Sequence, residues 1–149
     1  MAHVNIGKVH PKVYKAMTDL GEDAASTAGE EGLDPRLVEL VKIRASQING
    51  CAYCLRSHTR DAAALGETPE RLAVLAAWWE SQYFTPQERA ALLIVEKVTL
   101  ISDRAPAPAR EAADVDVLTE RQISAITWVA IAMNALNRIA VSSHFPVGA

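Results

Sequence analysis

Hydrophobic residues recur along this chain at the three- and four-residue spacing of amphipathic helices. Leu37, Leu40 and Val41 share one face of such a helix, and the segments 72–79 and 92–100 repeat the spacing. Alanine is abundant and runs of β-branched residues are short, which does not support strands. The pattern therefore predicts an all-α protein.

The predicted helices begin at residues that are typical N-caps. A Ser, Thr, Asp or Asn followed by proline, or by Glu or Gln three residues later, marks a helix start. Such starts occur at Asp34, Thr68, Thr85 and Thr119. Breaks are expected at Gly50, at Leu65-Gly66, around 83–85 and in the proline-rich stretch RAPAPAR, 104–110. We expect a bundle of about six helices, at about 9–13 to 28, 35 to 48, 52 to 65, 69 to 81, 86 to 102 and 119 to 143, with room for a short extra turn in 111–117.

Length and composition fit an ordinary globular protein. A chain of 149 residues with 50% hydrophobic and 22% charged residues suits a single domain spanning 1–149. Only 5% of the residues are aromatic, so the core must consist mainly of Ala, Leu, Val and Ile. The net charge of -3, without a cluster of Lys or Arg, argues against a nucleic-acid or anionic membrane surface.

The most apolar segment of the chain is Ile123–Val141. It also contains Thr127, Asn134, Asn137 and Arg138, which make it too polar for a membrane span. The N-terminal sequence lacks the apolar run of a signal peptide, so we expect a cytoplasmic protein. A helix that is apolar on nearly all sides must be buried on most of them, which predicts an oligomer whose interface helps to cover it.

Both cysteines of the chain, and one of its four histidines, lie within the sequence NGCAYCLRSH. Gly50 is expected to end one helix, and the next would begin at or just after Cys51, so Cys51, Cys54 and His58 would share one face. Unpaired backbone N–H groups and the helix dipole at a helix start favour a thiolate, and an imidazole can exchange its proton near neutral pH. Such a pair can close a disulfide, and its thiolate can attack a peroxide or a substrate disulfide. The break at Gly50 further predicts a partly exposed centre.

An acidic residue precedes the cysteine pair by about one helix. Glu39 lies twelve residues before Cys51, and a chain reversal at Asn49-Gly50 would bring it beside His58. A carboxylate there would orient the imidazole and raise its basicity. On its own, Glu39 fits better with a solvated charge beside Lys42 than with a role in a proton relay. Metal binding is the main alternative chemistry, because Cys51, Cys54, His58 and Glu39 offer S, S, N and O ligands to zinc, although three ligands on one short stripe strain a tetrahedral site.

The spacing Glu39–x11–Cys51–x2–Cys54–x3–His58 resembles the signature of the AhpD-like alkylhydroperoxidases of the carboxymuconolactone decarboxylase superfamily. The resemblance covers most of the chain after about Leu33. It includes LVELVKIRASQINGCAYC, YFTPQERAALLIVEKVT and NALNRIAVSSHFPVG.

This resemblance implies an all-α fold, assembled as trimers or as hexamers, and a peroxide-reducing dithiol. Cys54 would attack the peroxide, Cys51 would resolve the sulfenic acid to a disulfide, and His58 and Glu39 would form the proton relay. The implied partners are a hydroperoxide and an external dithiol donor, either a protein or a lipoyl group, with no cofactor or metal besides the redox-active disulfide. One position departs from the best-known two-cysteine peroxidases, which have histidine where this chain has Tyr53.

Other functions stay open at this point. They are the decarboxylase branch of the superfamily, whose members typically do without the cysteine pair, a non-catalytic redox sensor and a metal-binding module.

Overall fold

The computed structural model describes residues 3–103 and 113–148. Within these ranges the chain forms seven α-helices and two 3₁₀ helices and no strand, which confirms the predicted all-α fold. The elements are α1 (Ile6–Val9), α2 (Pro11–Glu30), α3 (Pro35–Asn49), α4 (Ala52–Ala64), α5 (Pro69–Val74), η1 (Leu75–Glu80), α6 (Pro86–Thr99), η2 (Val115–Val117) and α7 (Glu120–Ser142). The break predicted at 104–110 lies outside the described residues.

The helix starts follow the predicted caps. At each of the four positions a side-chain oxygen accepts a hydrogen bond from a backbone N–H of the first turn, and these positions are Asp34, Thr68, Thr85 and Thr119. The last two form complete capping boxes, because Glu88 and Gln122 each bond back to the N–H of the cap residue. These local bonds therefore fix where α3, α5, α6 and α7 begin.

One predicted helix is broken. The segment expected to run from 69 to 81 divides into α5 and η1, and Ala77 within it has a non-helical backbone. Trp78, next to the break, is completely buried, and its Nε1–H donates to Glu96 Oε1 at 2.9 Å. Arg44 pairs with the same oxygen at 2.9 Å. A tertiary contact of a buried indole thus overrides the local helical pattern.

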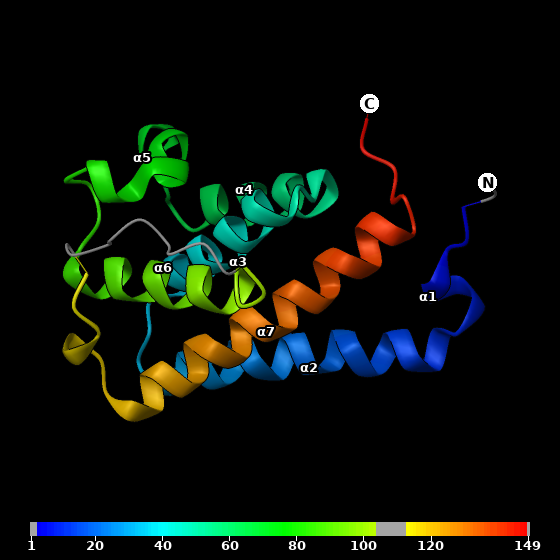
Figure 1. Ribbon diagram of the computed structural model, residues 1–149, viewed down its shortest axis with the longest axis horizontal. Helices are drawn as coiled ribbons and strands as arrows, with labels where there is room; N and C mark the ends of the chain where they lie inside the picture. Colours follow the sequence, from blue (N-terminus) through cyan, green and yellow to red (C-terminus); the bar gives the residue numbers. More distant parts are fainter. Residues whose placement is uncertain (1–2, 104–112, 149) are drawn as a thin grey trace.

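Helices α3 and α7 are the centre of the bundle. Helix α7 packs against α2, α3 and α6, while α3 also contacts α4 and α6, so α4 lies against the central pair (Figure 1). Both chain termini lie at the same end of the molecule (Figure 1), where the backbone N–H of Ile6 donates to Ser143 Oγ at 3.2 Å. This end also holds the start of α4, because Arg56 Nη1 contacts the carbonyl oxygen of Gly148 at 3.4 Å.

A buried amide network ties the end of α3 to α7. Asn49 Nδ2 donates to the Oδ1 atoms of both Asn134 and Asn137, each at 3.0 Å. Asn137 in turn donates to Ser46 Oγ at 3.0 Å, and Asn134 donates to Thr99 Oγ1 at 2.9 Å. The polar residues of α7 thus find partners within the chain, as buried amides require. The network also fixes the backbone immediately before the cysteine pair.

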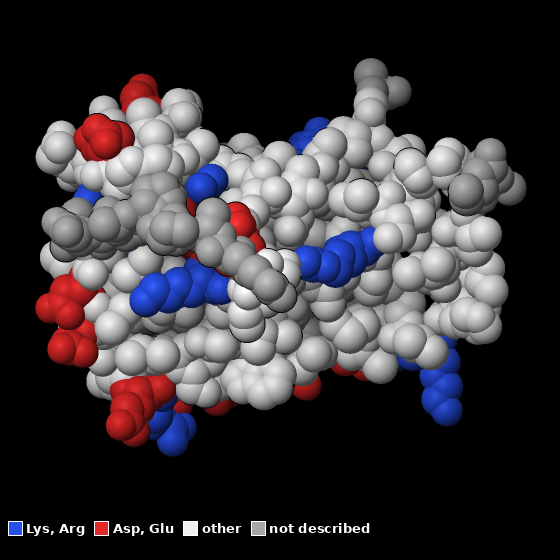
Figure 2. Space-filling model, in the orientation of Figure 1, with Lys and Arg blue, Asp and Glu red and all other residues white. Residues whose placement is uncertain are grey.

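Helix α7 is the one described helix that is long and apolar enough to span a membrane, and half of its most apolar window is buried inside the fold. Its outward face leaves Trp128, Ile131 and Val141 between 41% and 49% exposed. On the face drawn in Figure 2, described charged side chains of both signs are scattered and no basic patch dominates.

Candidate active site

The two cysteines are placed by a tight chain reversal between α3 and α4. Gly50 adopts the left-handed conformation, with φ of 66°, which glycine tolerates best, and the N–H of Cys51 bonds to the carbonyl of Ser46 at 3.0 Å. Cys51 is therefore the N-cap of α4 and lies just outside the helix, whereas Cys54 lies in its first turn. The backbone N–H of Cys54 donates to Cys51 Sγ at 3.3 Å.

Cys51 and Cys54 form a disulfide, and both residues are buried. Their exposed fractions are 1% and 4%, so the prediction of a partly exposed centre is wrong. The reason is that both cysteines pack into the hydrophobic core of the bundle. Phe145, after the end of α7, packs edge-to-face on Tyr53 with ring centroids 5.1 Å apart, and the two rings lie beside the sulfurs.

Glu39 and His58 meet as predicted. His58 Nδ1 lies 2.9 Å from Glu39 Oε2, and Lys42 Nζ lies 2.9 Å from the other carboxylate oxygen. Burial raises the pKa of Glu39, but the hydrogen bond from His58 and the charge and hydrogen bond of Lys42 outweigh burial and hold the pKa below its ordinary value. Glu39 is therefore ionised at neutral pH.

The ionised carboxylate sets the tautomer of the imidazole. A carboxylate can only accept hydrogen bonds, so the proton of a neutral His58 must be on Nδ1. Nε2 then carries the free lone pair and can take a proton from a neighbouring group. The His58 side chain is about one-fifth exposed, so it can reach both the interior of the site and solvent.

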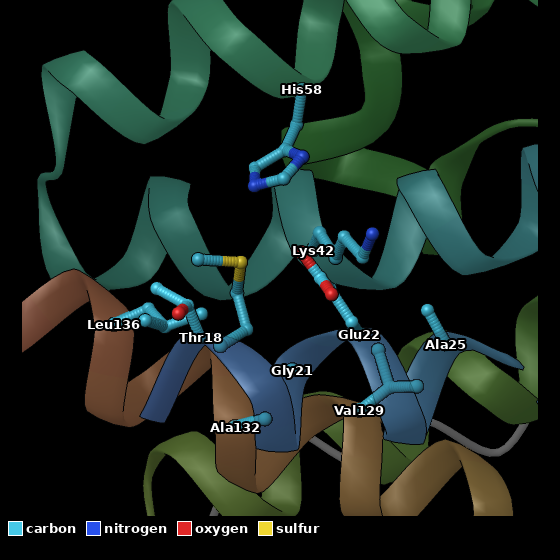
Figure 3. Close-up of a pocket in the computed structure, with 10 residues that line it drawn as sticks. Thr18, Gly21, Glu22, Ala25, Lys42, His58, Val129, Ala132 and Leu136 are labelled. Atoms are coloured by element: carbon cyan, nitrogen blue, oxygen red, sulfur yellow. The ribbon is translucent and has the colours of Figure 1, made fainter. Parts of the chain in front are cut away.

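Two connected cavities meet at His58. The smaller, of about 150 Å³, is lined by Cys54, His58, Tyr53 and Phe145, and it is the cavity that Cys54 reaches. The larger, of about 420 Å³, is lined by residues of α2, α3, α4 and α7, and His58 points into it from α4 toward α2 and α7 (Figure 3). Thr18, His58, Met133 and Leu136 line both cavities, so the two spaces adjoin at the imidazole.

The same acid–imidazole pair is also the group that most resembles a metal site. Among the described residues, Glu39, His58 and Asp61 bring ligand atoms within 4.8 Å of one another. The zinc set considered from the sequence differs from this group, because the sulfurs of Cys51 and Cys54 are bonded to each other. Both oxygens of Glu39 are already engaged, one by Lys42 and one by His58.

Sequence reasoning missed two residues of the site. The sequence suggested Lys42 only as a surface neighbour of Glu39, although a spacing of three on a helix is a sufficient signal that the two side chains meet. Phe145, which lines both the cavity at Cys54 and the cavity at Cys51, has no local signal in the sequence. Its role depends on how the end of α7 packs against α4.

An all-α bundle in which a C-x-x-C disulfide opens a helix beside a partly buried Glu–His pair defines an AhpD-like protein. The chain belongs to the carboxymuconolactone decarboxylase family, whose family model matches residues 11–97.

Two relatives illustrate this membership. The chain is 39% identical over 104 residues to the uncharacterized protein YdfG of Bacillus subtilis (strain 168), an alignment that covers 69% of this chain and 68% of YdfG. It is also similar to a solved protein from Agrobacterium tumefaciens, with a TM-score of 0.84 and 31% identity over 100% of this chain and 99% of the other. That protein is described as being of unknown function and is proposed there to be the antioxidant defence protein AhpD.

Proposed function

We propose that this protein is a thiol-dependent peroxidase that reduces alkyl hydroperoxides through its cysteine pair. One observation carries the proposal. Cys54 shares a cavity with His58, whose Nδ1 is hydrogen-bonded to the ionised carboxylate of Glu39. A thiol, a base and the group that orients the base are thereby arranged in sequence, as in other activated nucleophiles.

The oxidative half-reaction starts from the reduced pair. His58 takes the proton of Cys54, and the thiolate attacks the terminal oxygen of the hydroperoxide. The O–O bond breaks, Cys54 becomes a sulfenic acid, and the alkoxide leaves as an alcohol with the proton that His58 held. The peroxide gains two electrons and the sulfur loses two.

Cys51 then completes the disulfide. Its thiolate attacks the sulfur of the sulfenic acid, the hydroxide takes up the proton that the Cys51 thiol gave up and leaves as water, and the Cys51–Cys54 bond forms. The N–H of Cys54 on Cys51 Sγ favours the thiolate form of Cys51, because it donates a hydrogen bond to the charged sulfur. An external dithiol donor, a protein or a lipoyl group, would return two electrons to the pair.

The cavity walls favour a substrate with an apolar body. Val129, Met133 and Leu136 of α7 form one side of the larger space, and its volume of about 420 Å³ leaves room for an alkyl group next to His58. The hydroperoxide group itself would lie in the smaller cavity at Cys54.

The test is turnover of tert-butyl hydroperoxide with dithiothreitol as donor. The wild-type protein should consume peroxide, Cys54→Ser should be inactive, and His58→Asn should be slowed by about 10²-fold or more, the usual range for loss of a general base. Exposed His10 offers a matched control, and His10→Asn should retain wild-type turnover. Wild-type turnover by Cys54→Ser would overturn the proposal, and a decarboxylase activity that survives loss of both thiols would favour the other branch of the family.

We also propose a cytoplasmic homo-oligomer, a trimer or a hexamer, as the working form. The support is the exposed apolar face of α7 at Trp128 and Ile131. Trp128→Glu should shift the mass measured by light scattering toward that of the monomer. A monomeric wild-type protein at micromolar concentration would contradict this.

A further inference from the structure

We propose that the reducing thiol attacks Cys51 rather than Cys54, from a second cavity that Cys51 lines and Cys54 does not, and that His144 accepts its proton there. This inference rests on the redox pair of the proposed function. It adds a direction for the reductive half-reaction and a second imidazole that the oxidative half-reaction does not use.

The two sulfurs face different cavities. Cys51, but not Cys54 or His58, lines a space of about 200 Å³ together with His144. The cavity of about 150 Å³ at Cys54 contains His58 and contains neither Cys51 nor His144. The walls common to the two spaces are Tyr53, Ala140 and Phe145. The edge-to-face pair of Tyr53 and Phe145 thus lines both a space that holds Cys54 and His58 and a space that holds Cys51 and His144.

This division fits the geometry of thiol–disulfide exchange. An attacking thiolate forms its new bond to one sulfur while the other sulfur leaves, so it approaches from the side away from the leaving sulfur. A thiolate in the Cys51 cavity meets Cys51 first, and Cys54 is then released toward His58. Reduction by this route leaves Cys54 as a thiolate in the cavity where peroxide would bind.

His144 is held in this cavity by an unusual backbone conformation. It is the one described residue other than glycine with a positive φ, 50°, and it closes the end of α7 through the bonds His144 N–H to Val141 O and Phe145 N–H to Ala140 O. This position usually holds glycine or asparagine, because the left-handed backbone strains most other residues. The strained residue is thus an imidazole that lines the same cavity as a reactive sulfur.

Each step of the proposed reduction balances. The first thiol of the donor gives its proton to His144, and its sulfur bonds to Cys51 while the Cys51–Cys54 bond breaks and Cys54 leaves as a thiolate. The second thiol of the donor releases its proton to solvent and attacks the donor sulfur that is bound to Cys51. The donor leaves as a disulfide, and Cys51 leaves with the proton that His144 held. Two electrons pass from donor to protein.

Few charged groups face His144. The ring of His3 packs on it with centroids 3.6 Å apart, and Tyr53 lines the same cavity. Arg56 lies over the Tyr53 ring at 5.7 Å and contacts the C-terminal segment at Gly148. A change in the pH profile on replacing His144 must therefore be compared with the effect of replacing His3.

The experiment measures reduction alone, with no peroxide present. The oxidised wild-type protein, His144→Asn, His144→Gly, His3→Asn and the control His10→Asn are mixed with dithiothreitol, quenched with an alkylating agent and analysed by mass spectrometry across pH. Asparagine and glycine both suit the left-handed backbone at position 144, so the fold should be kept. We expect both His144 variants to be reduced at least about tenfold more slowly than the wild type at neutral pH. The pH profile of their reduction rate should also differ from that of the wild type, whereas His10→Asn should match the wild type in both respects.

A monothiol locates the attacked sulfur. Brief treatment of the oxidised protein with 2-mercaptoethanol should give a mixed disulfide on Cys51, mapped by peptide mass spectrometry. An adduct on Cys54 would overturn the proposal, as would wild-type reduction rates in both His144 variants. A pH dependence of the reduction rate that changes only in His3→Asn would also overturn it. If the protein does not turn over peroxide but its reduction still depends on His144, the proposed function is refuted and this inference is retained.

Discussion

Replacing Glu39 with glutamine removes one charge from the site and almost no volume. Glu39 accepts two charge-assisted hydrogen bonds, from Lys42 and His58, each at 2.9 Å. Glutamine has one acceptor oxygen and one donor amide, so it can replace only one of them and must point N–H groups at the other donor. Because a hydrogen bond to a charged group contributes about 1.5–3 kcal/mol, Glu39→Gln should lower the free energy of unfolding by about 2 kcal/mol.

The same change should act more strongly on the reaction than on the fold. If the amide of the new glutamine faces His58, the imidazole must turn its lone pair toward that amide and carry its proton on Nε2, where it can no longer serve as a base. We expect the rate of Cys54 oxidation by tert-butyl hydroperoxide to fall about 10²-fold or more. Glu30, an exposed residue at the end of α2, offers a matched control, and Glu30→Gln should change neither quantity measurably.

The pH dependence of the free energy of unfolding gives a second test, because the direction of the change is fixed by the lowered pKa of Glu39. The pKa of Glu39 is lowered in the folded protein, so its contribution to stability is complete above the unfolded pKa of about 4.3 and is lost as pH falls through the folded value. Urea unfolding of the oxidised proteins should therefore show a difference between wild type and Glu39→Gln that is constant near neutral pH and shrinks in acid. A folded Glu39→Gln protein that oxidises Cys54 at the wild-type rate would refute the relay.

Three further substitutions test neighbouring parts of the account. Lys42→Met removes the charge and hydrogen bond that help to lower the pKa of Glu39, so that pKa should rise and the acid loss of stability should begin at a higher pH, measured by urea unfolding at several pH values. Asn49→Ala leaves the Oδ1 atoms of Asn134 and Asn137 without the bond from Asn49, and should lower the free energy of unfolding by about 2 kcal/mol; a loss within error would contradict a structural role for the amide network. Gly50→Ala meets no atom within 4 Å but must adopt a φ of 66°, so chemical denaturation should show a cost of about 1 kcal/mol and no cost would mean that the reversal is not strained.

Much of the fold was predictable because its helix boundaries are determined by residues that are close to them in the sequence. The caps at Asp34 and Thr85 and the glycine at position 50 act within a few residues of themselves, so their outcome does not depend on the rest of the chain. The meeting of Glu39 and His58 needs only two helices and one reversal between them, but the family signature was needed to prefer it over a solvated carboxylate.

The remaining features depend on contacts between distant segments. The sulfurs are buried because both cysteines join a core that is built from several helices, and Phe145, which lines the cavities beside them, lies beyond the end of α7 and far away in the sequence. The break at Ala77 accompanies a bond between Trp78 and Glu96 of another helix. No periodicity or local motif encodes such contacts, and for that reason the division of the site into a Cys54 side and a Cys51 side emerged only from the structure.

The most direct measurement follows the first oxidised sulfur. Reduced Cys51→Ser protein, which cannot close the disulfide, is mixed with one equivalent of tert-butyl hydroperoxide and trapped with dimedone, in parallel with the same variant carrying His58→Asn. The account predicts a dimedone adduct on Cys54 that forms rapidly, and about 10²-fold more slowly without His58. An adduct that forms equally fast with and without His58, or no sulfenic acid on Cys54 at all, would contradict it.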